Sequence, residues 1–130
     1  MPAINFTHQY LWGTTANNSS NRPYSEVRIT GTAGTVRLWS IMDTGADYMQ
    51  FEPAVATAAG ISTAAAAMTT IQGATGTASM PLVSAVSVEI EGNPVSVEAL
   101  VGGSGRAVVG RRAIITAIEF GMDQHGWLYK

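Results

Sequence analysis

A carboxylate stands at the end of an apolar strand in the segment Ile41-Met42-Asp43-Thr44-Gly45-Ala46-Asp47. Small or apolar residues lead into Asp43, and Gly45 frees the backbone for a sharp turn. The hydroxyl of Thr44 can form a hydrogen bond to another segment of backbone. An acid in this position is unusual, and we interpret Asp43 as half of a catalytic pair. The alternative is a structural turn that the carboxylate caps by itself.

Hydrolysis of a peptide bond by carboxylates needs two of them around one water molecule. Two carboxyls held close cannot both ionise easily, so the pair shares a proton near working pH. The chain has three aspartates, Asp43, Asp47 and Asp123, and only the first ends an apolar strand before Thr-Gly. A symmetric homodimer is the simplest source of a second copy. A glycosidase needs two different acids in one cleft, and the sequence offers no second candidate.

Around this turn the sequence has the two-residue period of half-buried strands. Short helices are indicated at 54–59, between Pro53 and Gly60, and at 111–120, with Ile114, Ile115 and Ile118 on the inner face. The tract 63–67 either extends the first helix or forms a turn. Strands are expected at 26–30, 36–39, 68–72, 77–80, 86–90, 95–101 and 107–110, with a last hairpin at 121–129.

Two segments have alternative interpretations. The hairpin at 68–80 has threonine-rich flanks with little to bury, so it either projects over something or is an ordinary surface hairpin. Residues 1–24 form an aromatic arm that either packs as an edge strand on its own domain or reaches a partner subunit.

Length and composition limit the class of protein. The 130 residues suit a single domain, 1–130, and a hydrophobic share of 46% against 12% charged predicts a well-buried one. The net charge of -2 gives no electrostatic basis for binding nucleic acid. Without a signal sequence or a bilayer-spanning window, no membrane association and a cytoplasmic location are expected. No cysteine is present, and His8 and His125 have no ligands at suitable spacing, so no metal site is expected.

The segment 43–47 resembles the signature of retropepsin-like aspartic proteases, the half-length, dimeric relatives of pepsin. The resemblance continues to Val108-Val109-Gly110-Arg111, which matches the apolar pair and Gly-Arg that open a helix in this family. It extends from about Tyr24 to about Ile118. It implies an all-β closed barrel with a flap hairpin and one or two short helices. It also implies a homodimer with one active site, a peptide or protein substrate, and no cofactor.

The resemblance also implies a role for each matching residue. Asp43 is the catalytic residue, and Thr44 locks the two active-site loops across the dimer axis. Asp47 contacts the substrate backbone and forms an ion pair with Arg111 of the same subunit. The active-site loop is supported by Thr44, Gly45 and Ala46, and substrate is bound by Gly45, Asp47, Gly73, Ala74, Thr75 and Gly76.

Three features differ from the family pattern. The N-terminal 24 residues exceed what a minimal retropepsin needs, the expected flap lacks an isoleucine-rich glycine tip, and Tyr48 stands where many viral enzymes have a second acid. A domain that keeps the fold but only grips peptides, without cutting them, is therefore the rival hypothesis.

Overall fold

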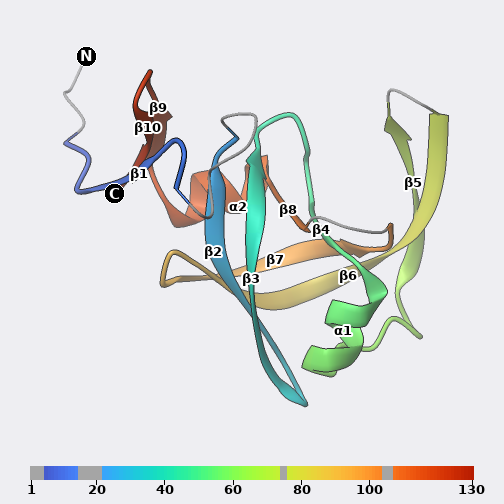
Figure 1. Ribbon diagram of the computed structural model, residues 1–130. Helices are drawn as coiled ribbons and strands as arrows, with labels where there is room; N and C mark the ends of the chain where they lie inside the picture. Colours follow the sequence, from blue (N-terminus) through green and yellow to red (C-terminus); the bar gives the residue numbers. More distant parts are fainter. Residues whose placement is uncertain (1–4, 15–21, 74–75, 104–106) are drawn as a thin grey trace.

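The fold was analysed in a computed structural model that describes residues 5–14, 22–73, 76–103 and 107–130 (Figure 1). Strands dominate, and two short helices accompany them. In chain order the elements are β1 (His8–Leu11), β2 (Tyr24–Gly31), β3 (Gly34–Asp43), β4 (Met49–Phe51), α1 (Pro53–Ala59), β5 (Ala67–Gly73), β6 (Gly76–Ile90), β7 (Asn93–Val101), β8 (Ala107–Gly110), α2 (Arg111–Ala117), β9 (Phe120–Met122) and β10 (Gly126–Tyr129).

Six strands close into a barrel, which confirms the predicted fold class. Their order is β2-β3-β8-β4-β7-β6, and β6 pairs again with β2 to complete the ring. Closure removes the open edges that a flat sheet would expose. The seventh strand, β5, pairs only with β6, and together they form a hairpin that stands away from the barrel at the right of Figure 1.

The β2–β3 hairpin follows the alternation in the sequence. Val27 and Ile29 are fully buried, whereas Arg28 and Thr30 between them are exposed. The strands pair from Tyr24↔Ile41 to Gly31↔Gly34, and β3 then continues to Asp43. The predicted hairpin and the position of the acid at the end of its second strand are therefore confirmed.

The strands expected at 77–80 and 86–90 are one strand, β6. A shift in register between Val83 and Val86 marks a β-bulge, and Ala85 there adopts a positive φ of 58°. A bulge bends a strand and increases its twist. Because of this bend, one half of β6 belongs to the barrel and the other half to the β5–β6 hairpin.

The first helix agrees with the prediction, while the second is shorter than predicted. Helix α1 begins at Pro53, and Gly60 ends it in the left-handed conformation, with φ 76°. The tract 63–67 forms a turn, with the Ala66 amide bonded to the Thr63 carbonyl, and its last residue, Ala67, begins β5. Helix α2 ends at Ala117, because the chain must extend again to form β9.

The assignment of Ile115 to the inner face of the second helix was wrong. Its side chain is 73% exposed, whereas Ile114 and Ile118 are buried. Adjacent residues of an α-helix point about 100° apart, so Ile115 points away from the barrel when Ile114 faces it.

The aromatic arm packs on its own chain. Strand β1 pairs antiparallel with β10, which pairs with β9, forming a three-stranded terminal sheet at the upper left of Figure 1. Tyr10 stacks on the fully buried Trp127, with ring centroids 5.1 Å apart. His8 stacks on Tyr129 at 4.6 Å.

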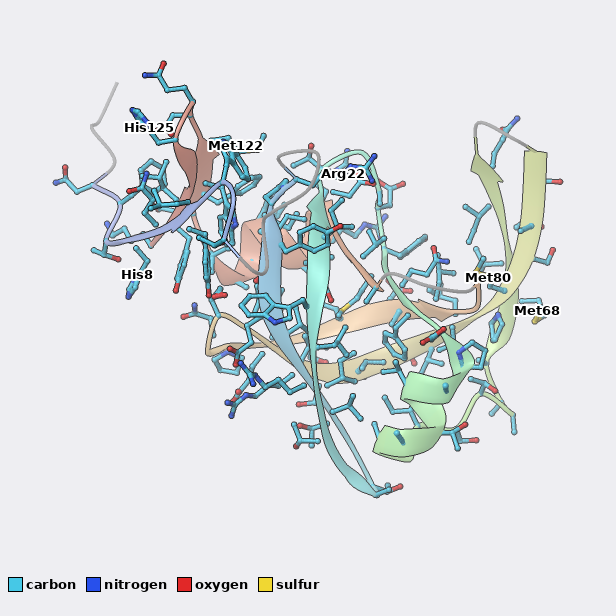
Figure 2. All side chains as sticks on the ribbon, in the orientation of Figure 1. His8, Arg22, Met68, Met80, Met122 and His125 are labelled. Atoms are coloured by element: carbon cyan, nitrogen blue, oxygen red, sulfur yellow. The ribbon has the colours of Figure 1, made fainter. Side chains whose placement is uncertain are left out.

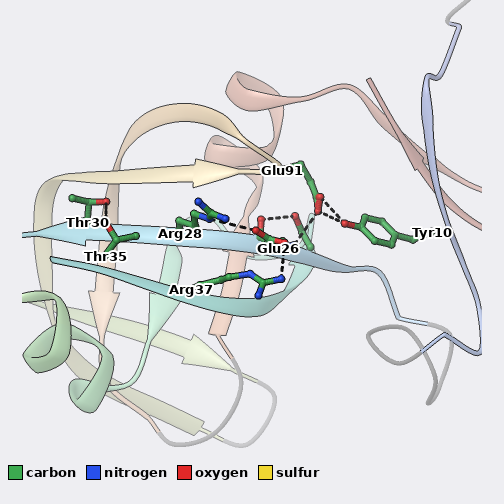
Figure 3. Close-up of polar contacts among 8 residues, drawn as sticks. Tyr10, Glu26, Arg28, Thr30, Thr35, Arg37 and Glu91 are labelled. Atoms are coloured by element: carbon green, nitrogen blue, oxygen red, sulfur yellow. Dashed lines mark hydrogen bonds and ion pairs between the residues drawn. The ribbon is translucent and has the colours of Figure 1, made fainter.

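The Tyr10 hydroxyl connects this terminal sheet to the turn between β6 and β7 (Figure 3). The Tyr10 hydroxyl lies 2.7 and 2.9 Å from the two carboxylate oxygens of Glu91, to which it donates. Glu91 also accepts from the Glu26 amide at 3.0 Å. Burial, followed by the bond to Glu91, raises the pKa of Tyr10, and the bond from Arg37 lowers the pKa of the Glu26 carboxyl.

Replacing Tyr10 by phenylalanine removes the donor and leaves a half-buried carboxylate with one fewer partner. We expect Tyr10→Phe to lower the free energy of unfolding by about 1–2 kcal/mol, measured by denaturant titration at neutral pH. Thr30→Val is the control, because it removes a hydroxyl whose only partner in Figure 3, Thr35, is also exposed. Equal stability of Tyr10→Phe and the unmodified chain would show that this bond does not anchor the terminal sheet.

Candidate active site

Asp43 occupies the last position of β3, and that strand lies parallel to β8. The register pairs Met42 with Val109 and Asp43 with Gly110. Parallel strands end at the same edge of a sheet. The pairing therefore brings the segment 43–47 against the segment 108–111, some 65 residues later in the chain, and both leave the barrel side by side.

The Asp43 carboxylate is exposed at the start of a tight turn. Its Oδ1 accepts from the Gly45 amide at 2.9 Å, and its backbone carbonyl accepts from the Ala46 amide at 3.2 Å. The first bond defines an Asx turn. This local geometry fits both a structural turn and a catalytic aspartate. Thr44 is also exposed, and within the described ranges its hydroxyl makes no hydrogen bond.

Two bonds tie the turn to the start of α2. The Arg111 guanidinium donates from Nη2 to Asp47 Oδ1 at 2.6 Å, and the Arg111 amide donates to the Ala46 carbonyl at 2.7 Å. Both side chains of the ion pair are more than half exposed. An exposed pair contributes at most about 1 kcal/mol, well below the roughly 3 kcal/mol that is lost when one partner of a buried pair is removed.

Gly110 allows this close approach. A Cβ built on it would lie 2.4 Å from the Tyr48 carbonyl oxygen and 2.9 Å from the Asp47 carbonyl carbon, closer than real Cβ contacts. Any other residue would push β8 away from the segment 47–48. Packing at this buried position therefore requires the glycine of Val-Val-Gly-Arg.

A cavity of about 360 Å³ opens beside Asp43, between the barrel and β5. Its lining combines carboxylates, amides, hydroxyls and two large aliphatic side chains. The residues are Asp43, Gly45, Ala46, Asp47, Tyr48, Gln50, Thr69, Thr70, Ile71, Gln72 and Leu100. Four of the predicted site residues, Asp43, Gly45, Ala46 and Asp47, thus share one cavity with the β5 strand.

The tip of the β5–β6 hairpin carried four predicted site residues. Gly73 pairs with Gly76 at the end of the ladder. Ala74 and Thr75 lie outside the described residues. Thr69 and Ile71 on β5 are half-buried, whereas Thr70 and Gln72 are exposed. In Figure 2, Met68 and Met80 mark the lower part of this hairpin.

Gln50, Thr69, Ile71 and Leu100 line the cavity and were not predicted as site residues. A signal for one of them was present in the sequence. Met49 and Phe51 are fully buried, and successive side chains of a strand point to opposite faces, so Gln50 must face away from the core. The other three come from strands whose pairing partners no local pattern reveals.

The remaining charged side chains nearby form pairs. Arg112 lies 3.5 Å from Glu98 and 5.0 Å above the ring of Tyr48. Arg106 lies outside the described residues. Within the described ranges no group of three histidine, cysteine or acidic residues could hold a metal ion, and His8 and His125 belong to the terminal sheet and its turn (Figure 2). No helix of these ranges is long and apolar enough to cross a membrane.

A sequence model of the aspartyl protease family matches residues 25–122, which include the Asp43 turn, the cavity and the Gly110-Arg111 junction. The chain belongs to the aspartyl protease family. The match begins in β2 and ends in β9, so β1 and β10 fall outside it. A comparison with curated proteins found no match. For this aspartyl protease domain, the resemblance noted in the sequence is confirmed over three quarters of the chain.

The packing at Gly110 is testable by stability. We expect Gly110→Ala to lower the free energy of unfolding by about 1–3 kcal/mol, because the methyl group would overlap backbone atoms of Asp47 and Tyr48 that cannot move independently. Gly121→Ala is the matched control, since its new methyl would meet only the Phe6 ring, at 3.2 Å. Chemical denaturation of both variants gives the comparison, and a smaller loss for Gly110→Ala than for Gly121→Ala would contradict it.

Proposed function

We propose that this aspartyl protease domain is an endopeptidase whose active site is formed by Asp43 from each subunit of a homodimer. The observation that carries the proposal is the family match, together with a single exposed Asp43 beside a cavity open to β5. One chain supplies one such aspartate, and the chemistry needs two. A second copy related by a twofold axis supplies the other.

The two carboxyls would share one proton and hold one water molecule. The ionised carboxylate takes a proton from the water as its oxygen attacks the carbonyl carbon of the peptide, while the protonated carboxyl donates to the carbonyl oxygen. The tetrahedral intermediate then collapses, the C–N bond breaks, and the nitrogen leaves as an amine after receiving a proton from the dyad. Because the mechanism needs one carboxyl ionised and the other protonated, it predicts a bell-shaped dependence of rate on pH.

The other residues of the turn would position the dyad and the peptide. The exposed Thr44 hydroxyl is available to bond across the dimer axis to its counterpart. Gly45 and Asp47 would bind the substrate main chain, and the bond from Arg111 holds the Asp47 carboxylate in place for this role. Ala46 supports the loop through its carbonyl, which accepts the Arg111 amide.

The β5–β6 hairpin would act as a flap over an extended peptide. Its edge strand, β5, pairs only with β6 among the described residues, so its other edge offers backbone donors and acceptors to a peptide strand. The tip residues Gly73, Ala74, Thr75 and Gly76 would contact the substrate. Few buried side chains hold the hairpin, which suits a segment that has to open and close.

Removing the carboxylate of Asp43 tests the catalytic role. Incubated with a denatured protein between about pH 3 and 7, the unmodified chain is expected to generate peptides, and Asp43→Asn to reduce the rate about a thousandfold or more. Asp123→Asn is the control. Its side chain accepts from the His125 and Gly126 amides far from the cavity, and asparagine preserves an acceptor. Equal rates for the unmodified chain and Asp43→Asn would exclude this mechanism.

A binding module without catalysis is the second candidate. It is favoured by the projecting hairpin and by the aromatic arm, which need no chemistry to hold a peptide. If the substrate stays intact at every pH while peptides still bind with micromolar affinity, the module is supported and the enzyme is not.

The homodimer makes its own prediction. Specific activity is expected to fall steeply on dilution, as dimers dissociate and each monomer keeps half a site, and light scattering should show a mass twice that of one chain. The edges of the terminal sheet, β1 and β9, are the segments we expect at the interface. Full activity in a solution that contains only monomer would rule out the shared dyad.

A further inference from the structure

The face of the barrel that carries Asp43 has one polar side chain in an otherwise aliphatic row. Paired residues of neighbouring strands share a face. Following the pairs Ile41↔Val108, Val108↔Gln50, Gln50↔Leu100 and Leu100↔Leu82 therefore traces one row across five strands. Asp43 lies two residues beyond Ile41 on β3 and so points to the same face. Of these five residues, only Gln50 can form hydrogen bonds through its side chain, and beyond them on β2 lies Tyr24, the partner of Ile41.

The amide of Gln50 is only partly satisfied. Its Nε2 donates to the Gly102 carbonyl at 3.4 Å, the long end of the hydrogen-bond range. This contact also fixes the orientation of the amide, because a carbonyl can be met only by the NH₂ end. One N–H and the carboxamide oxygen remain without a partner among the described residues, and Gln50 lines the cavity that contains Asp43.

A bound peptide would exclude water from this amide, and a polar group left unpaired beneath a ligand weakens binding. A carboxamide offers both a donor and an acceptor, which matches the free N–H and the free oxygen. A hydroxyl also donates and accepts, but through a single oxygen atom, so it matches the separated N–H and oxygen of the amide less well. A carboxylate would be repelled by Asp43 and Asp47 in the same cavity. Leu100 and Ile71 would cover the aliphatic stem of the ligand side chain.

We propose that Gln50 selects peptides with a glutamine or asparagine side chain close to the bond that is cut. The position follows from the cavity, because an extended peptide advances about 3.3 Å per residue and one cavity holds both Asp43 and Gln50. The selected side chain therefore belongs to a residue one or two places from the scissile bond. This inference rests on the proposed peptidase function and names the substrate preference of the same site.

The test pairs a change in the protein with the same change in the peptide. A peptide library first locates the preferred positions, with products identified by mass spectrometry. Matched peptides with glutamine or the nearly isosteric methionine at that position are then compared by kcat/KM. The unmodified chain is expected to prefer glutamine by about tenfold or more, and Gln50→Met is expected to reverse the preference. Gln124→Met, an exposed amide in the β9–β10 turn, should leave both rate and preference unchanged.

A merely structural role for Gln50, holding Gly102, would change stability and overall rate but not the ratio between the two peptides. A preference of the unmodified chain for methionine over glutamine would overturn the inference, whether or not Gln50→Met folds, and would leave the peptidase standing.

If no peptide is cut, the peptidase proposal fails separately, and binding decides the role of Gln50. Peptides retained by the unmodified chain would then be sequenced. Enrichment in glutamine or asparagine that Gln50→Met removes would support the selection, and the absence of enrichment would overturn it.

Discussion

The parallel pairing of β3 with β8 is the constraint on which the site depends. In the barrel, β2–β3 and β6–β7 are hairpins, whereas β3 and β8 lie about 65 residues apart in the chain, and their pairing sets Asp43 opposite Gly110. A slip of one residue would turn every side chain of the strand to the other face, moving Met42 and Val109 out of the core. Burial of these two residues therefore fixes where the Asp43 carboxylate emerges.

Backbone contacts, more than charges, hold the turn in place. The Asp47–Arg111 ion pair is exposed on both sides and contributes little to stability by itself. The short approach at Gly110 and the bond from the Arg111 amide to the Ala46 carbonyl are independent of ionisation. The ion pair then acts mainly to orient Asp47.

The cavity lies between strands of the barrel, which form its floor, and the β5–β6 hairpin, which forms its roof. Its floor belongs to strands whose opposite faces carry the fully buried Met49, Phe51 and Ala99, whereas the β5–β6 hairpin contributes only half-buried and exposed side chains to it. Affinity for a peptide backbone can therefore come from the edge of β5, and discrimination between side chains from the floor. A packed backbone discriminates better because it holds the side chains that it carries at fixed positions.

The sequence by itself determined the features that depend on neighbours along the chain. These are the β2–β3 hairpin, helix α1 between Pro53 and Gly60, and the Asp43 turn, because two-residue alternation and turn residues act over a few positions. It also supplied the two family segments, 43–47 and 108–111. The tertiary structure decided what depends on distant pairing. Two expected strands are one strand with a bulge at Ala85, and β1 pairs with β10 of its own chain. Helix α2 ends earlier than predicted because the chain extends again into β9. The same holds for Gln50. The alternation of side chains predicts that it faces away from the core, but only the pairing of β4 with β7 and β8 shows that it faces the cavity.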